Sequence, residues 1–400
     1  MYSVDKLIHE THFIRKRPDG LKALTVSYLI LQFAIGMAGS FGVLFVFHLG
    51  QNTFQGLTLT VAYLCLQRTV VALVMPIVAV VTSKIGYRRT MLLGLISMAL
   101  KYLSLMAVGD MAMWLLIPAL IFGGISIPAY YLGYHALFID DNDDAKLGEQ
   151  IGFMAMLGGM AGAISPILSG LIIDTFDFPV MFGIAMVLML ISAIPLLLMK
   201  HHKKHIGTYS LKKVRKFVSK HKNVFWANLA WHFENSFQGL FWGVYLYLIL
   251  KSYTEFGAVG SVMAVMNSIA IYICGKLYDR RRAKKVFTNS AIVVSLAWIG
   301  RFLSTTPFSA IGFTALSRLF SPPWWMKIRR RELFIGEKTD SLVFSVAHEY
   351  VVTFSVIFGW VVGYLILLLT KEQWSWLILP IITGIFVSVR KMKSEQEVSY

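Results

Sequence analysis

The sequence predicts an all-α polytopic membrane protein with about twelve transmembrane helices in two pseudo-symmetric six-helix bundles. Of its 400 residues, 56% are hydrophobic and only 15% are charged, and the mean hydropathy is +0.64. Such a chain is too apolar to cover its own surface in water. Apolar runs of about 20 residues, long enough to cross a hydrocarbon layer of about 30 Å, recur from end to end. A densely basic segment divides these runs into two equal sets.

Each expected span is an apolar run that begins and ends at polar, basic or turn-forming residues. The first six lie at 22–48, 55–82, 90–108, 112–138, 150–173 and 178–199. The last six lie at 224–250, 256–278, 286–303, 308–326, 341–369 and 374–390. Residues 1–20 are polar and basic, so we expect them to stay attached ahead of the first span and not to form a cleaved leader. The expected domains are therefore a bundle over 1–199, a basic cytoplasmic linker over 200–222 and a bundle over 223–400.

The formal net charge of +17 is distributed over alternate loops. Basic residues gather before the first span and after the second, sixth, eighth and tenth spans, whereas the intervening loops carry almost none. This is the positive-inside pattern, and it predicts that both termini lie in the cytoplasm, with the chain in a cell (inner or plasma) membrane. It also explains the basic composition without nucleic acid. The expected partners are the lipid bilayer, a small-molecule substrate and protons, and the expected state is a monomer.

The two halves resemble each other at an offset of about 200 residues. The run Val43 to Phe47 aligns with Gly243 to Tyr247, and Ser83 to Arg88 matches the position of Asp279 to Arg282. Together with the equal numbers of spans, these pairs indicate a duplicated six-helix unit. Such internal repeats are known among secondary transporters.

On these residues the sequence resembles the major facilitator superfamily over essentially its whole length. The family's loop between its second and third helices typically reads Gly-x-x-x-Asp-Arg-x-Gly-Arg-Arg. Here the first copy keeps Lys84, Gly86 and Arg88 but has Ser83 at the usual aspartate, and the second copy begins at Gly275, Asp279 and Arg280. The family's antiporter-type glycine pattern is matched in the fifth span by Gly152, Ala161, Ser165, Pro166, Ser169 and Gly170. These small residues support the fold and do not indicate a direction of transport.

Ionisable side chains inside the spans are candidates for function, because a charge at bilayer depth costs at least about 2.5 kcal/mol. They are Arg68, Lys101, Glu234, Arg301, Arg318 and Glu349. The resemblance implies that helices one, four, seven and ten line a central cavity, which assigns Glu234 and Arg318 to that cavity. It also places Arg68 and Glu349 on the facing helices two and eleven, where the two charges could pair. Lys101 and Arg301 fall on supporting helices, where we expect structural or snorkelling roles.

The expected substrate and proton pathway is Glu234, Arg318, His232, Gln32, Tyr131, His135 and Trp242. Glu234 is interpreted either as a proton carrier or as one half of a permanent ion pair. Arg318 could clamp a carboxylate or phosphate, since its planar fork suits two acceptors. His232 could share the proton, and the aromatic residues could equally serve in packing or at the membrane interface.

The expected cytoplasmic gate consists of Gly275, Asp279, Arg280, Lys84, Gly86, Arg88, Asp143 and Asp144. The pseudo-symmetry that the resemblance implies brings the loop after the eighth span against the start of the fifth, so Arg280 should pair with Asp143 or Asp144. The matching contact would join Lys84, Arg88 and Arg89 to Glu332, Glu337 or Asp340.

The sequence therefore predicts a secondary active transporter that moves a small organic solute by alternating access with proton coupling. The excess of cations within the spans favours an anionic or polar substrate. Two alternatives remain: a multidrug-type efflux antiporter, and a non-transporting protein of the same fold that handles lipid or scaffolds a complex. An enzyme is not expected, because His232 with Glu234 and His348 with Glu349 are spaced so that the members of each pair face different directions. Cys65 and Cys274 lie in apolar runs, so neither a metal nor another cofactor is expected.

Overall fold

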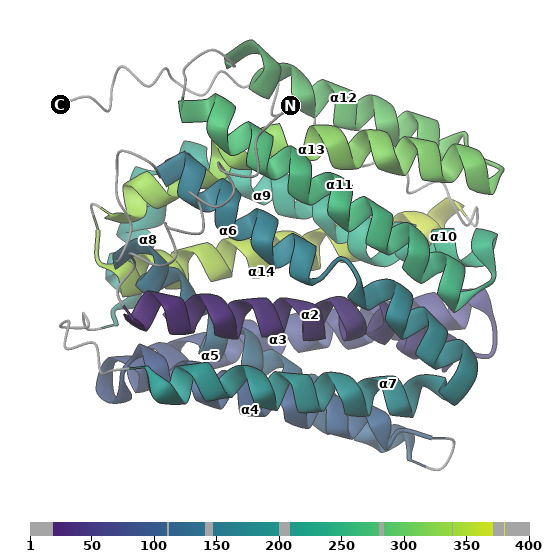
Figure 1. Ribbon diagram of the computed structural model, residues 1–400, viewed down its shortest axis with the longest axis horizontal. Coiled ribbons are helices and arrows are strands. Elements are labelled where there is room, and N and C mark those ends of the chain that lie inside the picture. Colours follow the sequence, from purple (N-terminus) through teal and green to yellow (C-terminus); the bar gives the residue numbers. More distant parts are fainter. Residues whose placement is uncertain are drawn as a thin grey trace.

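The computed structural model describes residues 19–109, 112–140, 147–199, 209–279, 284–337 and 339–370, together with Pro380. Within these residues every regular element is a helix, which confirms the predicted all-α class. Seven stretches of the described chain are long and apolar enough to cross a membrane, judged by length and composition. The long helices lie roughly side by side along the longest axis of the molecule (Figure 1). Helices suit this setting because all their backbone hydrogen bonds are satisfied within one segment.

The first half of the chain provides six spans. It consists of α2 (Asp19–His48), α3 (Thr53–Ile85), α4 (Tyr87–Met106), η1 (Met113–Leu115), α5 (Leu116–Asp140), α6 (Leu147–Ala161) and α7 (Ser165–Leu198). The fifth span is α6 and the first part of α7, interrupted between Ala161 and Ser165. At Asp177 the backbone leaves the helical conformation, with φ 69° and ψ 172°, and the rest of α7 returns as the sixth span.

In the described residues of the second half, helices lie at five of the six predicted spans. α8 (Leu211–Lys220) leads into the seventh span, which consists of α9 (Lys222–Phe237), a π-helical turn η3 (Gln238–Trp242) and α10 (Gly243–Leu250). Then follow α11 (Tyr253–Asp279), α12 (Lys284–Phe302), α13 (Pro307–Glu337) and α14 (Ser341–Thr370). Two of these helices, α11 and α14, hold stretches long and apolar enough to cross a membrane. The expected twelfth span, 374–390, lies outside the described residues except for Pro380.

The helix that holds the tenth span is longer than the predicted span. We expected the span to end at residue 326, and α13 continues through Glu337 over 31 residues. Residues 327–335 include neither glycine nor proline, and their apolar side chains keep the helical spacing, so basic residues alone do not end the helix. At 1.5 Å per residue α13 is about 46 Å long, so its last turns extend beyond a hydrocarbon layer of about 30 Å.

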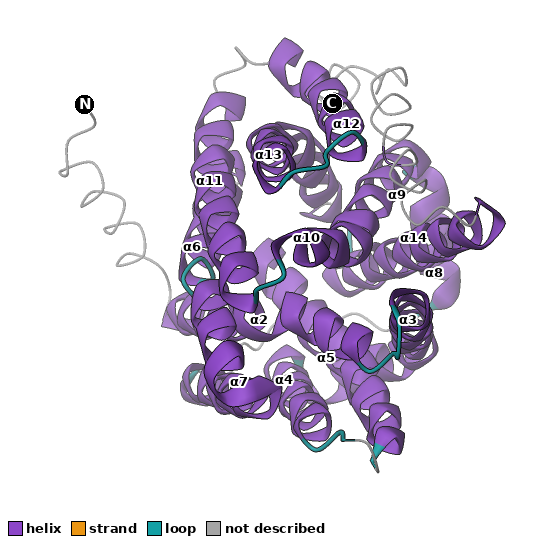
Figure 2. Cartoon of the chain, turned by 90° about the vertical axis from the view of Figure 1, so that its right-hand side faces the viewer, coloured by secondary structure: helices purple, strands orange, loops and turns teal. Residues whose placement is uncertain are grey.

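The helices form two groups that meet along two lines. In Figure 1, α2, α3, α4 and α5 lie in the lower part of the molecule and α11, α12 and α13 in the upper part. α11 packs along α6 and α7, and α14 packs against α3 and α5. Figure 2 shows the same arrangement nearly end-on, with α10 and α14 between the two groups. The central space is therefore bounded by helices from both halves.

Glycine allows direct backbone contact where α7 meets α11. A Cβ on Gly170 would collide with the carbonyl oxygen of Tyr253, and a Cβ on Gly257 would collide with the carbonyl oxygen of Pro166. Further along the same line, a Cβ on Gly152 would lie 3.2 Å from the Cα of Gly275. These positions require glycine because the helices approach backbone to backbone.

The two halves also meet at the end of the bundle that carries His48 and Lys251, which we call the far end. The Oδ2 atom of Asp174 accepts hydrogen bonds from the backbone N–H and the hydroxyl of Thr254, at 2.9 and 2.6 Å. The ring of His48 lies 5.0 Å from that of Tyr247 and 5.7 Å from that of Tyr253. Asp174 and His48 belong to the first half and their partners to the second, so polar and aromatic contacts join the halves here.

The described part of the basic linker forms an amphipathic helix, α8. Its Val214 and Phe217 are buried, whereas its lysine and arginine side chains are exposed. The Phe217 ring lies 5.6 Å from that of Phe225 on α9 and 6.3 Å from that of Phe344 on α14. α8 is therefore attached to the second half of the molecule.

Candidate functional site

A cavity of about 240 Å³ lies between the two halves. Six helices line it, with the residues Tyr28, Gln32, Tyr131, Tyr134, His135, Met154, Ala155, Asn228, His232, Trp325, Ile328, Arg329, Glu332, Leu333 and His348. A larger hollow of about 670 Å³, formed by α4 and α7, is lined by Met106 and residues between Pro179 and Leu188. That hollow offers no charged side chain, and several of its residues are exposed on the outer surface of the bundle. The interhelical cavity is therefore the candidate site.

Each helix turns one face towards the cavity. On α13 the lining residues are Trp325, Ile328, Arg329, Glu332 and Leu333, which repeat at the three- and four-residue spacing of a helix face. Tyr28 and Gln32 on α2, and Asn228 and His232 on α9, are four residues apart in the same way. The local helical period therefore decides which side chains reach the cavity.

Arg329 joins the two halves through hydrogen bonds inside the cavity. Its Nη2 donates to the Nδ1 atom of His135 on α5 at 2.9 Å, and its Nη1 donates to the Oε2 atom of Glu332 at 3.2 Å. The side chains of both Arg329 and Glu332 are largely buried, with 11% and 2% of their surface exposed. Arg329 therefore donates one hydrogen bond to a histidine of the first half and one to a carboxylate of the second half.

The carboxylate of Glu332 has three partners in the second half. Its Oε1 atom accepts from Nδ1 of His348 at 2.6 Å and from Nδ2 of Asn228 at 2.9 Å. Together with Arg329, these donors hold the carboxylate between α9, α13 and α14. A buried carboxylate is stable only with such donors, because an unpaired charge here would cost several kcal/mol.

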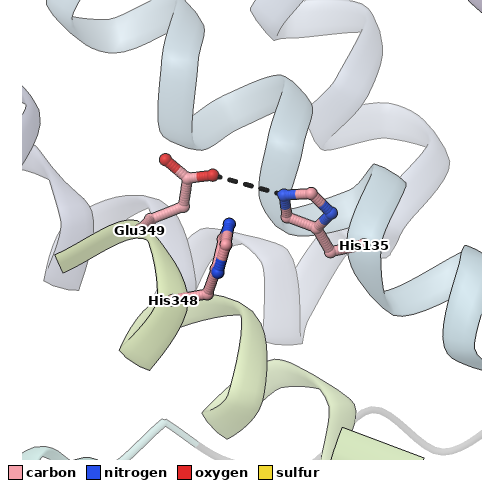
Figure 3. Close-up of side chains that lie close together, drawn as sticks. All are labelled: His135, His348 and Glu349. Atoms are coloured by element: carbon pink, nitrogen blue, oxygen red, sulfur yellow. Dashed lines mark ion pairs between the residues drawn. The ribbon is translucent and has the colours of Figure 1, made fainter. Parts of the chain in front are cut away.

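The histidine on α5 also contacts a second carboxylate. Nε2 of His135 lies 3.4 Å from Oε1 of Glu349 on α14, and Figure 3 shows this contact as a dashed line with His348 beside it. Arg68 on α3 interacts electrostatically with the same carboxylate. The predicted interface charges Arg68 and Glu349 thus lie on packed helices, with His135 as the closer partner of Glu349.

These contacts define the proton positions on two imidazoles. A guanidinium can only donate, so Nδ1 of His135 must be an acceptor and its proton must be on Nε2, facing Glu349. A carboxylate accepts, so Nδ1 of His348 carries a proton that points to Glu332. We call the connected side chains Asn228, Glu332, His348, Arg329, His135 and Glu349 the cavity network.

A metal ion fits this arrangement poorly. His135, His348 and Glu349 could each offer a ligand atom, and these atoms lie within 4.8 Å of one another. However, a histidine binds a metal through an unprotonated nitrogen, and Nε2 of His135 carries its proton while Arg329 occupies Nδ1. The neighbouring cations Arg68 and Arg329 further oppose a divalent cation.

Aromatic side chains form one wall of the cavity. The rings of Tyr28 on α2 and Tyr134 on α5 stack with centroids 4.9 Å apart. Tyr131 stacks on His135 at 5.9 Å, and Trp325 lines the opposite half. With Met154 and Ile328 beside them, these rings leave a partly apolar space next to the charged network.

Four residues of the expected pathway line the cavity: Gln32, Tyr131, His135 and His232. The other three, Glu234, Arg318 and Trp242, are not among its lining residues, and their part in the pathway stays a prediction. Glu234 is absent from the lining because of the helical period, since residues two apart on α9 point about 200° from each other. Since His232 faces the cavity, Glu234 faces away from it.

Glu234 belongs to a separate buried group inside the second half, which we call the tryptophan cluster. Its Oε1 atom accepts from Nε1 of Trp298 on α12 at 2.8 Å. Arg301, fully buried, lies 4.3 Å from the ring of Trp298 and 4.8 Å from the ring of Trp242, and its Nη1 donates to Gln238 at 2.7 Å. Arg301 and Arg318 both interact electrostatically with Glu234. Arg301 is thus paired internally and does not snorkel.

The expected gate falls partly on residues outside the described chain. Asp143, Asp144 and Arg280 are outside it, and Asp279 is the last residue of α11, its side chain outside the described part. Gly86 joins α3 to α4 with φ 90°, a conformation that favours glycine, and Lys84 is exposed beside it.

The structure brings this loop to the start of the eleventh span, where the hydroxyl of Tyr87 lies 3.1 Å from that of Ser341. In the described residues, the charged groups named for this contact have partners other than the expected ion pairs. Arg88 donates to the backbone oxygen of Met199, Glu332 belongs to the cavity network, and Oδ1 of Asp340 accepts from the N–H of Leu342. Because α13 is longer than expected, Glu332 lies on a helix face and not in a loop.

Sequence reasoning missed Arg329, Glu332, His348 and Asn228 as site residues. Arg329 and Glu332 were counted among the charges of a loop, although their three-residue spacing matches one helix face. His348 was considered only with Glu349 as a possible catalytic pair. Adjacent residues point about 100° apart, which allows the two side chains to contact different members of one network.

Comparison with known proteins agrees with the family resemblance seen in the sequence. A sequence profile of the Major Facilitator Superfamily matches residues 24–326. The chain is also 25% identical over 213 residues to an uncharacterized protein, YqgE, of Bacillus subtilis (strain 168), with 50% of this chain and 48% of that protein covered. The match to this curated relative therefore spans about half of its length.

Solved structures resemble the chain over nearly its whole length. The E. coli fucose:proton symporter FucP matches with a TM-score of 0.66 and 13% identity, covering 92% of this chain and 96% of that chain. FucP in an outward conformation gives a TM-score of 0.65 at 13% identity, with the same coverage. The human organic anion transporter MFSD10 gives 0.67 at 10% identity, covering 92% and 98%. At these identities the likeness shows the fold alone.

Proposed function

Because the chain belongs to the major facilitator superfamily, we propose that it is a proton-coupled carrier that moves a small polar or anionic organic solute by alternating access. The fold is that of a secondary transporter and not of an enzyme. One observation carries the finer proposal: a cavity lies between the two halves, and His135 of the first half accepts a hydrogen bond from Arg329 and directs its Nε2–H at Glu349, both of the second half. Contacts of this kind change when the halves rock against each other.

The cavity network supports proton coupling. Glu332 and Glu349 are carboxylates in contact with histidines, and Glu332 and two of the histidines line the cavity, where a solute could alter their surroundings. Glu234, the carboxylate expected to carry the proton from the sequence, contacts Trp298 instead. We therefore assign the coupling to the cavity network and keep Glu234 as the competing site.

The basic loops support an orientation with both termini in the cytoplasm of a cell membrane. α8 is consistent with this orientation, because its buried face holds Val214 and Phe217 while its lysines could meet anionic lipid headgroups. The gate at Lys84, Gly86, Arg88 and Gly275 would then open on the cytoplasmic side.

Reconstitution tests the proposal. The full chain in proteoliposomes is given an imposed pH gradient, and uptake is screened over a panel of labelled sugars, amino acids, small carboxylates and organic cations. We expect at least one polar or anionic solute to accumulate above its external concentration, and accumulation to disappear when a protonophore dissipates the gradient. Accumulation that ignores the protonophore would remove the proton from the mechanism, and no accumulation of any solute would contradict the transport proposal.

Glu349→Gln and Glu234→Gln then distinguish the two coupling sites. With the solute found in the screen, loss of accumulation in the first variant only supports the cavity network. Loss in the second only would transfer the role to the tryptophan cluster.

A further inference from the structure

The hydrogen bond from Arg329 to His135 keeps this histidine neutral. The guanidinium occupies Nδ1, and Nε2 already carries a proton. A second proton could bind only at Nδ1, where it would collide with the N–H groups of Arg329. His135 can therefore become an imidazolium only after Arg329 has moved to another acceptor.

An anion in the cavity would provide that acceptor. A carboxylate binds arginine best through two parallel N–H groups, and both Nη1 and Nη2 of Arg329 are already engaged. Glu332 is charged and is held by His348 and Asn228 as well, whereas His135 is a neutral acceptor. Because hydrogen bonds to ionised acceptors are roughly twice as strong as neutral ones, the carboxylate would displace His135 and not Glu332.

The balance of charge favours one proton for each monoanion. Arg68 and Arg329 offset Glu332 and Glu349 while the histidines are neutral. A monoanion would leave the buried site with one uncompensated negative charge, which is costly at this depth. One proton on His135 restores neutrality, and Glu349 at 3.4 Å is placed to stabilise the resulting imidazolium. If a dianion bound instead, one negative charge would remain uncompensated after His135 had taken up its proton.

Several charged and titratable groups surround His135. They are Arg329 and Glu332 on α13, His348 and Glu349 on α14, Arg68 on α3, His232 on α9, Tyr28 on α2, Tyr87 on α4, and Tyr131 and Tyr134 on its own helix. Lys101 on α4 packs beside Gly123, about 18 Å from His135 along α5. It interacts electrostatically with Arg68, whereas the cations that interact directly with Glu332 and Glu349 are Arg329 and Arg68. Among the groups on other helices, Arg329 alone blocks Nδ1, so its movement controls protonation.

The remainder of the cavity selects the body of the anion. The stacked rings of Tyr28 and Tyr134, the indole of Trp325, and the side chains of Ile328 and Leu333 provide apolar surface within about 240 Å³. A compact aromatic or aliphatic group fits this surface better than a strongly hydrated one.

We propose that the substrate is a small organic monocarboxylate that takes Arg329 away from His135, so that His135 binds one proton at Nδ1 for each anion bound. This inference rests on the proposed function and adds to it the substrate class and the proton-binding atom. The proton comes from water on the open side of the membrane. It returns when the anion leaves and Arg329 comes back to Nδ1, so no other reactant is needed.

The test is calorimetric, with the full chain in lipid nanodiscs near neutral pH and benzoate as the probe. Titrations in buffers of different ionisation enthalpy give the number of protons taken up per anion bound. For the unmodified protein we expect about one proton per benzoate, and we expect the neutral isostere benzamide to bind at least about tenfold more weakly, since it cannot form a charge-assisted pair.

Two substitutions separate anion binding from protonation. In His135→Gln the amide oxygen can still accept from Arg329, so benzoate should bind with a similar affinity but without proton uptake. This also excludes binding of benzoic acid itself, which would bring a proton in either protein. Arg329→Lys keeps the charge but loses the planar fork, so we expect about tenfold weaker binding or worse. His221→Gln, on the surface between α8 and α9, is the matched control and should retain about one proton per anion.

The proposal is overturned if benzoate binds without proton uptake, if His135→Gln still takes up a proton, if benzamide binds as well as benzoate, or if benzoate does not bind at all. The proposed function and this inference can also be contradicted independently of each other. Gradient-driven accumulation of a sugar with no binding of benzoate would keep proton-coupled transport and reject the monocarboxylate. Proton-linked benzoate binding without accumulation of any solute would keep the site and reject transport.

Discussion

The cavity network and the tryptophan cluster contain similar side chains in different mechanical settings. Each holds a buried glutamate near an arginine, with hydrogen-bond donors and aromatic rings around it. The cavity network crosses from α5 to α13 and α14. The hydrogen bonds and cation–π contacts described for the tryptophan cluster join α9, η3 and α12, all of the second half. Contacts within one packed group persist when the groups move, whereas contacts between them must break and form again. An intramembrane charge is therefore informative about coupling only when its partners lie across the moving boundary.

Glu349→Gln is expected to have the largest effect, because it removes the carboxylate that joins α14 to His135. With a pH difference of one unit, coupling to a single proton supports up to about tenfold accumulation, since the gradient supplies about 1.4 kcal/mol. The variant should reach only the external concentration, while exchange of labelled for unlabelled solute continues. The measurement is uptake into proteoliposomes with and without the gradient. Full accumulation would remove Glu349 from the coupling.

Arg301→Gln tests the tryptophan cluster. Replacing a fully buried arginine leaves Glu234 without one of its cations and removes contacts to two indole rings, so we expect a loss of about 3 to 5 kcal/mol in the free energy of unfolding. Arg329→Gln, in the cavity, should cost less, because Glu332 keeps His348 and Asn228 as hydrogen-bond donors. Thermal unfolding of both variants in one detergent compares them. An equal loss for the two would contradict the distinction between the regions.

Trp298→Phe is a milder change in the same cluster. It keeps a ring beneath Arg301 but removes the N–H that donates to Glu234 at 2.8 Å. An unsatisfied buried acceptor costs about 1 to 3 kcal/mol. We expect a lower unfolding temperature with an unchanged number of protons moved per solute. A changed proton ratio in flux measurements would show that the cluster takes part in coupling.

Asp174→Asn should have the smallest effect. The Asp174 carboxylate lies at the start of α11, where it accepts two hydrogen bonds from Thr254 across the halves. Because the residue is exposed, the charge contributes only about 0.3 to 1 kcal/mol, which corresponds to a shift of about two- to fivefold towards an open far end. Distances between spin labels on α7 and α11 measure the populations. An unchanged distribution would show that the aromatic contacts alone close this end.

Most of the fold could be predicted from the sequence, because a bilayer demands apolar helices of fixed length and basic loops mark their ends. Only part of the site was predictable, since helix number identifies the cavity-lining helices but not the face that each one presents. Gln32 and His135 line this cavity, whereas Glu234, which was assigned to the cavity from its helix alone, does not. Arg329 was missed because a charged residue beyond an apolar run resembles a loop residue. Its position depends on the uninterrupted length of α13.

The backbone contact between α7 and α11 has a consequence for kinetics. Where side chains interdigitate, one helix can move past another only if the side chains first separate or change rotamer, which raises the activation barrier. At Gly170 and Gly257 there are no side chains to separate, because each glycine lies against the carbonyl of the facing helix. This smooth contact lowers the barrier in both directions equally and leaves the relative free energies of the two access states unchanged. Its glycines would therefore set the turnover frequency of the carrier, independently of solute affinity and of the side on which the solute is released.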